Sequence, residues 1–202
     1  MGKRSRVGHH LVDAWREVIE SEYRHGHINS ERSLQGHLFA ELRQRMRADG
    51  EPSRKIFIEP LVRLGSENRV VRPDIVVCNS EEVICVVELK YTPRGTAQTA
   101  KDMRSIGAIA ADKQIEIAVE RYRGPAIRLK PYRISETTLF TWAGVHSGTG
   151  EKSDVWTADD RFAKHYYLEL HALTRKDESP KLVCNTDALR KPQDFEAYQD
   201  WQ

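Results

Sequence analysis

The chain has few of the residues that hold small secreted or metal-bound domains together. It contains three cysteines in 202 residues, without C-x-x-C spacing, so neither a disulfide framework nor a paired-cysteine zinc site is expected. Glycine and proline number 12 and 8, too few for a collagen-like or low-complexity chain. No apolar run reaches the roughly 18 residues of a membrane span. With no apolar stretch behind the basic N-terminus to form a signal peptide, the sequence predicts a cytoplasmic protein without a membrane partner.

Charge of either sign is nearly balanced, with 32 Lys and Arg against 30 Asp and Glu. The total therefore says little about partners, and the distribution says more. Basic residues gather in three clusters, namely Lys3, Arg4 and Arg6; Arg43, Arg45 and Arg47; and Arg121, Arg123, Arg128, Lys130 and Arg133. A solvated face or tail is the simpler interpretation of each cluster, and contact with nucleic-acid phosphates is the alternative.

The spacing of apolar residues predicts the order helix, three strands, helix, strand. Apolar positions three and four apart indicate helices, and short continuous or alternating runs indicate strands. We expect helices over 11–24, between Ser30 and Asp49 and over 97–113. Strands are expected over 56–64, interrupted or kinked at Pro60, and over 74–78, 83–90 and 138–145, with Val70 and Val71 leading into the second of them. Short turns between the first three strands predict an antiparallel meander. Residues 166–173 fit a helix or a strand equally well.

The second and third strands are apolar on both faces, so helices should cover the sheet on both sides. The predicted fold class is α/β, with a central mixed sheet that contains the meander and an αβββαβ core. We expect residues 1–28 to form a basic tail and a helix packed on the core, and residues 29–145 to form the core itself. Residues 146–202 would be a C-terminal extension of the same domain, ending in a polar tail.

One group of charged residues stands out at the ends of two expected strands. Asp74 opens the second strand, and Glu88 and Lys90 close the third. Side chains alternate along a strand, so Glu88 and Lys90 share one face and Leu89 lies on the other. A two-residue turn would place Asp74 opposite Val87, and one residue more would place it opposite Glu88. In either register the two carboxylates are cross-strand neighbours, about 5 Å apart.

Two carboxylates this close in a half-buried place raise one pKa or require a cation. Mg²⁺ or Mn²⁺ prefers such oxygen ligands, and Lys90 adds a positive charge that can polarise a phosphate or orient water. The plainer alternative is a strand start at Asp74 and an exposed salt bridge worth less than about 1 kcal/mol. The apolar run over 83–87, directly before Glu88, favours the metal site.

The motif Pro73-Asp74, thirteen intervening residues and then Glu88-Leu89-Lys90 resembles that of the PD-(D/E)xK nuclease superfamily. The order of elements over 29–145 also resembles the core of that superfamily. The resemblance implies a restriction-endonuclease-like fold and an Mg²⁺- or Mn²⁺-dependent hydrolase that cleaves phosphodiester bonds by attack of activated water. It also implies a nucleic-acid partner, DNA in preference to RNA.

By the same resemblance, Asp74, Glu88 and the backbone carbonyl of Leu89 would ligate the metal, and Lys90 would orient the attacking water or stabilise negative charge. Members often add a glutamate from the helix before the meander. Glu31 lies at that position, in phase with the apolar stripe of its helix, although a first-turn acid favoured by the helix dipole explains it equally well. Glu41 is in phase too and is the second choice.

The remaining charged and aromatic residues have simpler interpretations. Gln98, Lys101 and Asp102 should form an exposed polar face, and His165 and His171 should be surface or packing residues. Two rival functions stay open. In the first, the chain is a non-catalytic scaffold or nucleic-acid-binding subunit of a DNA-processing or defence complex. In the second, it is an α/β protein of unrelated function whose hairpin only mimics the motif. A homodimer or a partner protein is compatible with every one of these readings.

Overall fold

The computed structural model describes residues 5–50, 53–65, 69–119, 128–148, 160–162 and 164–184. Four members of the basic clusters, Lys3, Arg4, Arg121 and Arg123, lie outside these ranges. The polar tail expected after Lys176 lies outside them only from residue 185 on. The predicted division at residues 28 and 145 stays a prediction.

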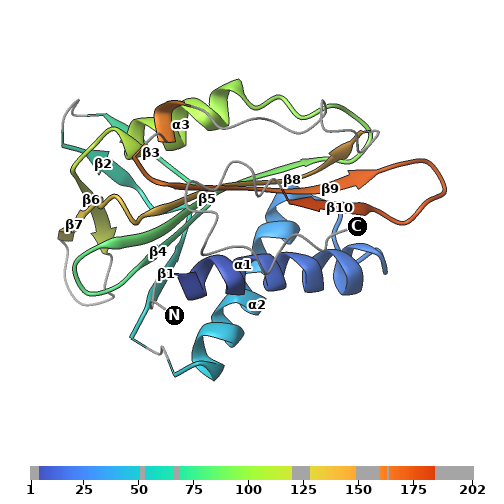
Figure 1. Cartoon of the computed structure of the whole chain (residues 1–202), viewed down its shortest axis with the longest axis horizontal. Coiled ribbons are helices and arrows are strands. Elements are labelled where there is room, and N and C mark those ends of the chain that lie inside the picture. Colours follow the sequence, from blue (N-terminus) through green and yellow to red (C-terminus); the bar gives the residue numbers. More distant parts are fainter. Residues whose placement is uncertain are drawn as a thin grey trace.

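A six-stranded mixed sheet forms the centre of the molecule (Figure 1), in the order β1-β4-β5-β8-β9-β10. Its strands are β1 (Lys55–Ile58), β4 (Ile75–Cys78), β5 (Val83–Thr92), β8 (Leu139–Ser147), β9 (Tyr166–Thr174) and β10 (Lys181–Cys184). Neighbours β1, β4 and β5 are antiparallel, β5, β8 and β9 are parallel, and β10 is antiparallel to β9. The predicted mixed sheet and its antiparallel meander are therefore confirmed.

Helices lie on both faces of this sheet, as expected for strands without a polar face (Figure 1). The helices α1 (Ser5–Glu17), continued by the π-helical turn η1 (Val18–Tyr23), and α2 (Glu31–Ala48) lie on one side, and α3 (Ala100–Ala110) lies on the other. Strand β4 serves both cores, because Ile75 belongs to the apolar cluster shared with α2 and Val76 to the cluster shared with α3. A short 3-10 turn, η3 (Asp160–Phe162), packs against α3.

The expected strand over 56–64 is interrupted at Pro60 as predicted, but the turn at Glu59 and Pro60 also sends its two halves into different sheets. Glu59 has a positive φ of 43°, and proline has no N–H with which to continue a ladder. The segment divides into β1 and β2 (Val62–Leu64), and the valines that lead into the expected second strand form a separate strand, β3 (Val70–Val71), before β4. A second sheet of order β3-β2-β6-β7 results, completed by β6 (Gln114–Val119) and β7 (Arg128–Arg133), two strands that the sequence analysis did not predict.

The undecided segment 166–173 is the strand β9. It runs parallel to β8 in the interior of the sheet, and Tyr167 to Leu173 are all buried. A strand covered on both faces has no polar side to reveal its period of two, which explains the ambiguity.

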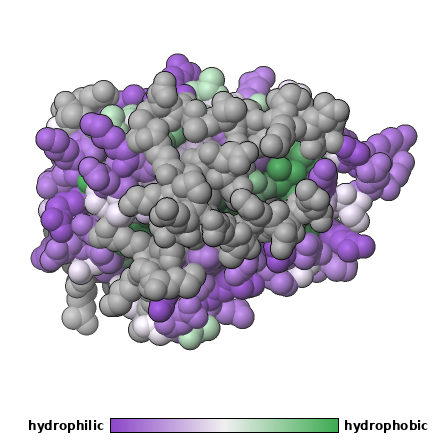
Figure 2. Space-filling view, in the orientation of Figure 1, coloured by the Kyte–Doolittle hydropathy of each residue, from purple (hydrophilic) through white to green (hydrophobic). Residues whose placement is uncertain are grey.

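Apolar residues show only in small areas of the described surface in Figure 2. The only large apolar side chains counted as exposed within the described ranges are Ile58 and Val70. Cys78 and Cys85 are buried free thiols, and Cys184 is a half-buried one. Among the described helices, none combines the length and the apolar character needed to cross a bilayer.

Candidate active site

The register of β4 and β5 brings the two acids of the motif together. Cys78 pairs with Val83 beside the turn, but an irregularity between Val77 and Cys78 shifts the rest of the ladder by one residue. The shifted ladder places Asp74, the residue before β4, beside Glu88. Beside the turn the two strands pair in the first predicted register, and beyond the irregularity they pair in the second. Turn length alone does not predict such a bulge.

The carboxylate of Asp74 is held by hydrogen bonds from two other elements. The backbone N–H of Leu89 donates to Asp74 Oδ2 at 2.6 Å. The side-chain amide of Gln35, buried on α2, donates to the carbonyl oxygen of Asp74 at 3.0 Å and to its Oδ1 at 3.3 Å. Sequence reasoning missed Gln35, although a polar residue between Leu34 and Leu38 of the buried stripe was a signal for it.

Glu88 has one carboxylate oxygen without a hydrogen-bond partner. Its carboxylate accepts a hydrogen bond from the backbone of Asp74, but Oε2 is buried and has no hydrogen-bond partner. Burial raises the pKa of Glu88 to about 9, and the nearby carboxylates of Asp74 and Asp102 add to the increase. Burial also raises the pKa of Asp74 to about 7. Both acids therefore tend to keep their protons near neutral pH unless a cation compensates their charge.

Lys90 lies between carboxylates from the first turns of two helices. Its Nζ is 3.9 Å from Glu31 Oε2, at the start of α2, and 3.8 Å from Asp102 Oδ2, near the start of α3. Glu31 Oε2 also accepts a hydrogen bond from the backbone N–H of Tyr91 at 3.1 Å. Glu41 forms an ion pair with Arg45 at 2.8 Å instead. The structure thus brings Glu31 together with Asp74, Glu88 and Lys90.

Asp102 corrects the sequence analysis, which expected it on an exposed polar face. It is only 5% exposed, and Trp142 Nε1 donates to its Oδ2 at 3.5 Å. Gln98 and Lys101 are exposed as predicted. A signal for Asp102 was present, because it stands four residues before the buried Ile106, in phase with the stripe of α3.

Gly144 allows Trp142 to reach Asp102, and we expect Gly144→Ala to destabilise the protein. A Cβ at this position would lie 2.1 Å from Trp142 Cη2, so the indole or β8 would have to move. Overpacking of this kind costs about 1–3 kcal/mol, measurable by urea denaturation. Gly36→Ala is the matched control, because nothing lies within 4 Å of its added Cβ, and there alanine should stabilise α2. Equal stability of wild type and Gly144→Ala would contradict this role.

The donor set of the site fits a hard divalent cation. Asp74 and Glu88 supply carboxylate oxygens, one of them buried without a partner, and oxygen donors are what Mg²⁺ and Mn²⁺ prefer. Within the described ranges, no three His, Cys, Asp or Glu side chains are placed to hold a metal ion. Two carboxylates with a backbone carbonyl and solvent would then form the ligand set, and the carbonyl that the sequence motif suggests is that of Leu89, the residue directly after Glu88.

Comparisons with known proteins identify no family. No protein-family model and no curated protein matches this chain. Among solved structures, it is similar to NucC from P. aeruginosa ATCC27853 in its cAAA-bound form, with a TM-score of 0.42 and 9% identity over 90% of this chain and 81% of that one. It is also similar to cAAA-bound NucC from E. coli MS115-1, with a TM-score of 0.41 and 9% identity over 92% of this chain and 83% of that one.

Proposed function

We propose that this protein is a nuclease that depends on Mg²⁺ or Mn²⁺ and hydrolyses phosphodiester bonds, with DNA as its substrate. The observation that carries the proposal is the meeting of Asp74, Glu88 and Lys90 at one corner of the sheet, where Glu88 Oε2 is buried without a partner. An isolated pair of buried acids is costly for a fold. A cation bound between the two carboxylates would offset this cost.

Each residue would have a separate role. Asp74 and Glu88, with the carbonyl of Leu89, would hold the metal ion, which when bound neutralises phosphate charge and makes nearby water more acidic. Lys90 would donate a hydrogen bond to the scissile phosphate or to the attacking water, where negative charge develops. Glu31 and Asp102, 3.9 Å and 3.8 Å from Lys90 Nζ, would hold its ammonium group in position at the site. Gln35 would fix the orientation of Asp74.

A scaffold without catalysis is the alternative, and it explains the site less well. A protein that only binds needs no half-buried set of two acids and a lysine at a strand end, and such a set reduces stability when it is empty. Thermal denaturation with added Mn²⁺ separates the two, because a ligand that binds only the folded state at one hundred times its Kd adds about 2.7 kcal/mol of stability.

The decisive experiment is a cleavage assay on circular single-stranded, linear duplex and branched DNA, with and without Mn²⁺. We expect metal-dependent cleavage that Lys90→Ala reduces by about 10²- to 10³-fold. Lys101→Ala, an exposed lysine one residue from Asp102, is the control for a general loss of charge, and the melting temperature of each variant is compared with wild type. Cleavage at equal rates by wild type and Lys90→Ala would remove Lys90 from the mechanism and indicate a contaminating nuclease.

A further inference from the structure

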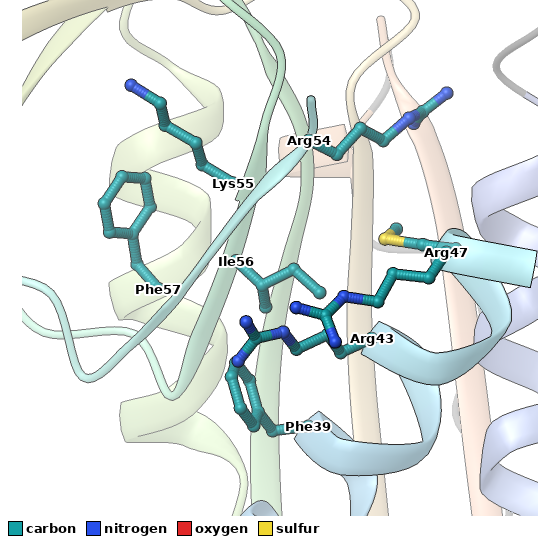
Figure 3. A pocket seen from close by; sticks show the side chains of 8 residues that line it. Phe39, Arg43, Arg47, Arg54, Lys55, Ile56 and Phe57 are labelled. Carbon is teal, nitrogen blue, oxygen red and sulfur yellow. The ribbon is translucent and has the colours of Figure 1, made fainter. Parts of the chain in front are cut away.

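A pocket of about 320 Å³ opens between the C-terminal half of α2 and the edge strand β1 (Figure 3). Four cationic side chains line it together with apolar ones. The residues of interest are Arg43, Arg47, Arg54, Lys55, Phe39 and Ile56. No acidic side chain is among the residues that line this pocket. It therefore combines concentrated positive charge with an apolar floor, unlike the carboxylate-rich site at the other end of α2.

Three of the four cationic side chains of the pocket have no acidic partner among the described residues. Within the part of the chain that the structure describes, Arg43, Arg47 and Lys55 form no ion pair with an acidic residue. Arg43 and Arg47 are four residues apart on α2, a spacing at which like charges repel. The helix dipole favours Arg47 in the last turn, but it does not account for Arg43 or for Lys55 on β1. A bound anion would compensate these three charges.

The apolar part of the pocket includes the partly exposed ring of Phe39. Arg43 Cζ lies 5.9 Å from the centroid of the half-buried Phe39 ring. Figure 3 shows Arg43 and Arg47 extending toward Phe39 and Ile56, and Arg54 extending at the opposite end. Aromatic rings and guanidinium planes are the surfaces on which unpaired nucleic-acid bases stack. The pocket thus offers a base platform directly beside phosphate-binding groups.

The pocket and the candidate active site lie along the same elements. Arg43 follows Glu31 by twelve residues on α2, which is about 18 Å of helix. Strand β1 runs antiparallel to β4, and its last residue Ile58 pairs with Ile75, next to Asp74. A short stretch of a nucleic-acid strand can therefore reach from one to the other along α2 and β1.

We propose that this pocket binds a single-stranded segment of nucleic acid, with phosphates on Arg43 and Arg47 and a base stacked on the Phe39 and Arg43 platform. A duplex keeps its bases stacked inside and cannot offer one to Phe39, so the pocket selects unpaired strands. The inference rests on the proposed function in one respect, namely that the bound strand is the substrate of the nuclease. The substrate class is then single strands or duplexes with unpaired ends.

The test measures binding without cleavage. Fluorescence anisotropy of the full chain in EDTA would compare an oligo-dT strand, an abasic strand of the same length and a blunt duplex, between 50 and 200 mM salt. We expect Phe39→Leu to weaken dT binding about 5- to 150-fold and to leave abasic-strand binding unchanged. The logarithm of the binding constant falls linearly with the logarithm of the salt concentration. The double variant Arg43→Ala/Arg47→Ala should make this slope shallower for the dT strand by about 1.4, which corresponds to two phosphate contacts.

The matched control is Arg63→Ala/Arg104→Ala, two arginines that lie on other elements, which should leave the dT salt slope close to wild type. The inference is overturned if the abasic strand or the blunt duplex binds as tightly as dT. It is also overturned if Phe39→Leu binds dT normally while melting like wild type, or if the control variant lowers the salt dependence of dT binding equally. No binding of any of the three nucleic acids, as expected of a pocket that binds only a protein partner, would overturn it too. The two proposals fail separately. Wild-type protein that binds dT more tightly than the abasic strand but does not cleave DNA with Mn²⁺ contradicts only the proposed nuclease, whereas protein that cleaves but binds both strands equally contradicts only the pocket.

Discussion

Glu88→Gln is expected to abolish metal-dependent cleavage while the fold stays intact. The amide keeps the shape of the side chain but removes the negative charge that would hold a cation, so we expect the cleavage rate to fall by about 10²- to 10⁴-fold. Thermal stabilisation by Mn²⁺ should disappear in the same variant. Because the charge removed is buried and one of its oxygens has no partner, the metal-free variant should be at least as stable as wild type at pH 8.

Glu41→Gln is the control for this substitution, since Glu41 lies on α2 and pairs with Arg45 away from the site. Its loss should cost less than about 1 kcal/mol and leave cleavage unchanged. Full activity of Glu88→Gln, or an undiminished response of its melting temperature to Mn²⁺, would eliminate the metal site and leave the scaffold interpretation.

The second large effect is a loss of stability as pH rises in the absence of metal. Burial raises the pKa of Asp74 to about 7 and that of Glu88 to about 9, from ordinary values of 3.8 and 4.5. The folded state therefore holds more protons than the unfolded state between about pH 4 and pH 9. The free energy of unfolding must fall over that range, because each pKa unit corresponds to about 1.36 kcal/mol. This contribution is complete below pH 4 and is lost as pH passes through 7 and then 9.

Urea denaturation in EDTA at pH 5, 7 and 9 measures this slope. Glu88→Gln should flatten its upper part, between pH 7 and 9, and Asp74→Asn its lower part. Added Mg²⁺ should act in the opposite direction, with a stabilisation that grows from pH 5 to pH 9, because the acids must lose their protons to bind it. A wild-type stability that is constant from pH 5 to 9 in EDTA would show that neither acid is buried in the folded protein as described here.

Local sequence patterns predicted most of the central sheet. Continuous apolar runs predicted β4 and β5, and the capping residue Ser30 marked the start of α2, where its side chain accepts a hydrogen bond from the Ser33 N–H. Period-two alternation correctly placed Glu88 and Lys90 on one face. These features depend on neighbours in the chain, so the sequence contains them directly.

The second sheet was missed because its strands are short and their partners are distant. Strand β2 has three residues, and its partner β6 lies about fifty residues later in the chain. The turn at Glu59 also separates it from β1, which joins the other sheet. Such pairings are decided by long-range contacts, which a window of a few residues does not contain.

The sequence by itself determined that Asp74, Glu88 and Lys90 stand at the ends of two strands, because alternation and apolar runs are properties of local pattern. Only the tertiary structure decided which partners these residues have. A bulge in the β4–β5 ladder sets Asp74 beside Glu88, and packing of α3 over β5 buries Asp102 against Lys90. The physical reason is that hydrogen bonds such as that of Gln35 with Asp74 join groups 39 residues apart, and folding alone determines their geometry.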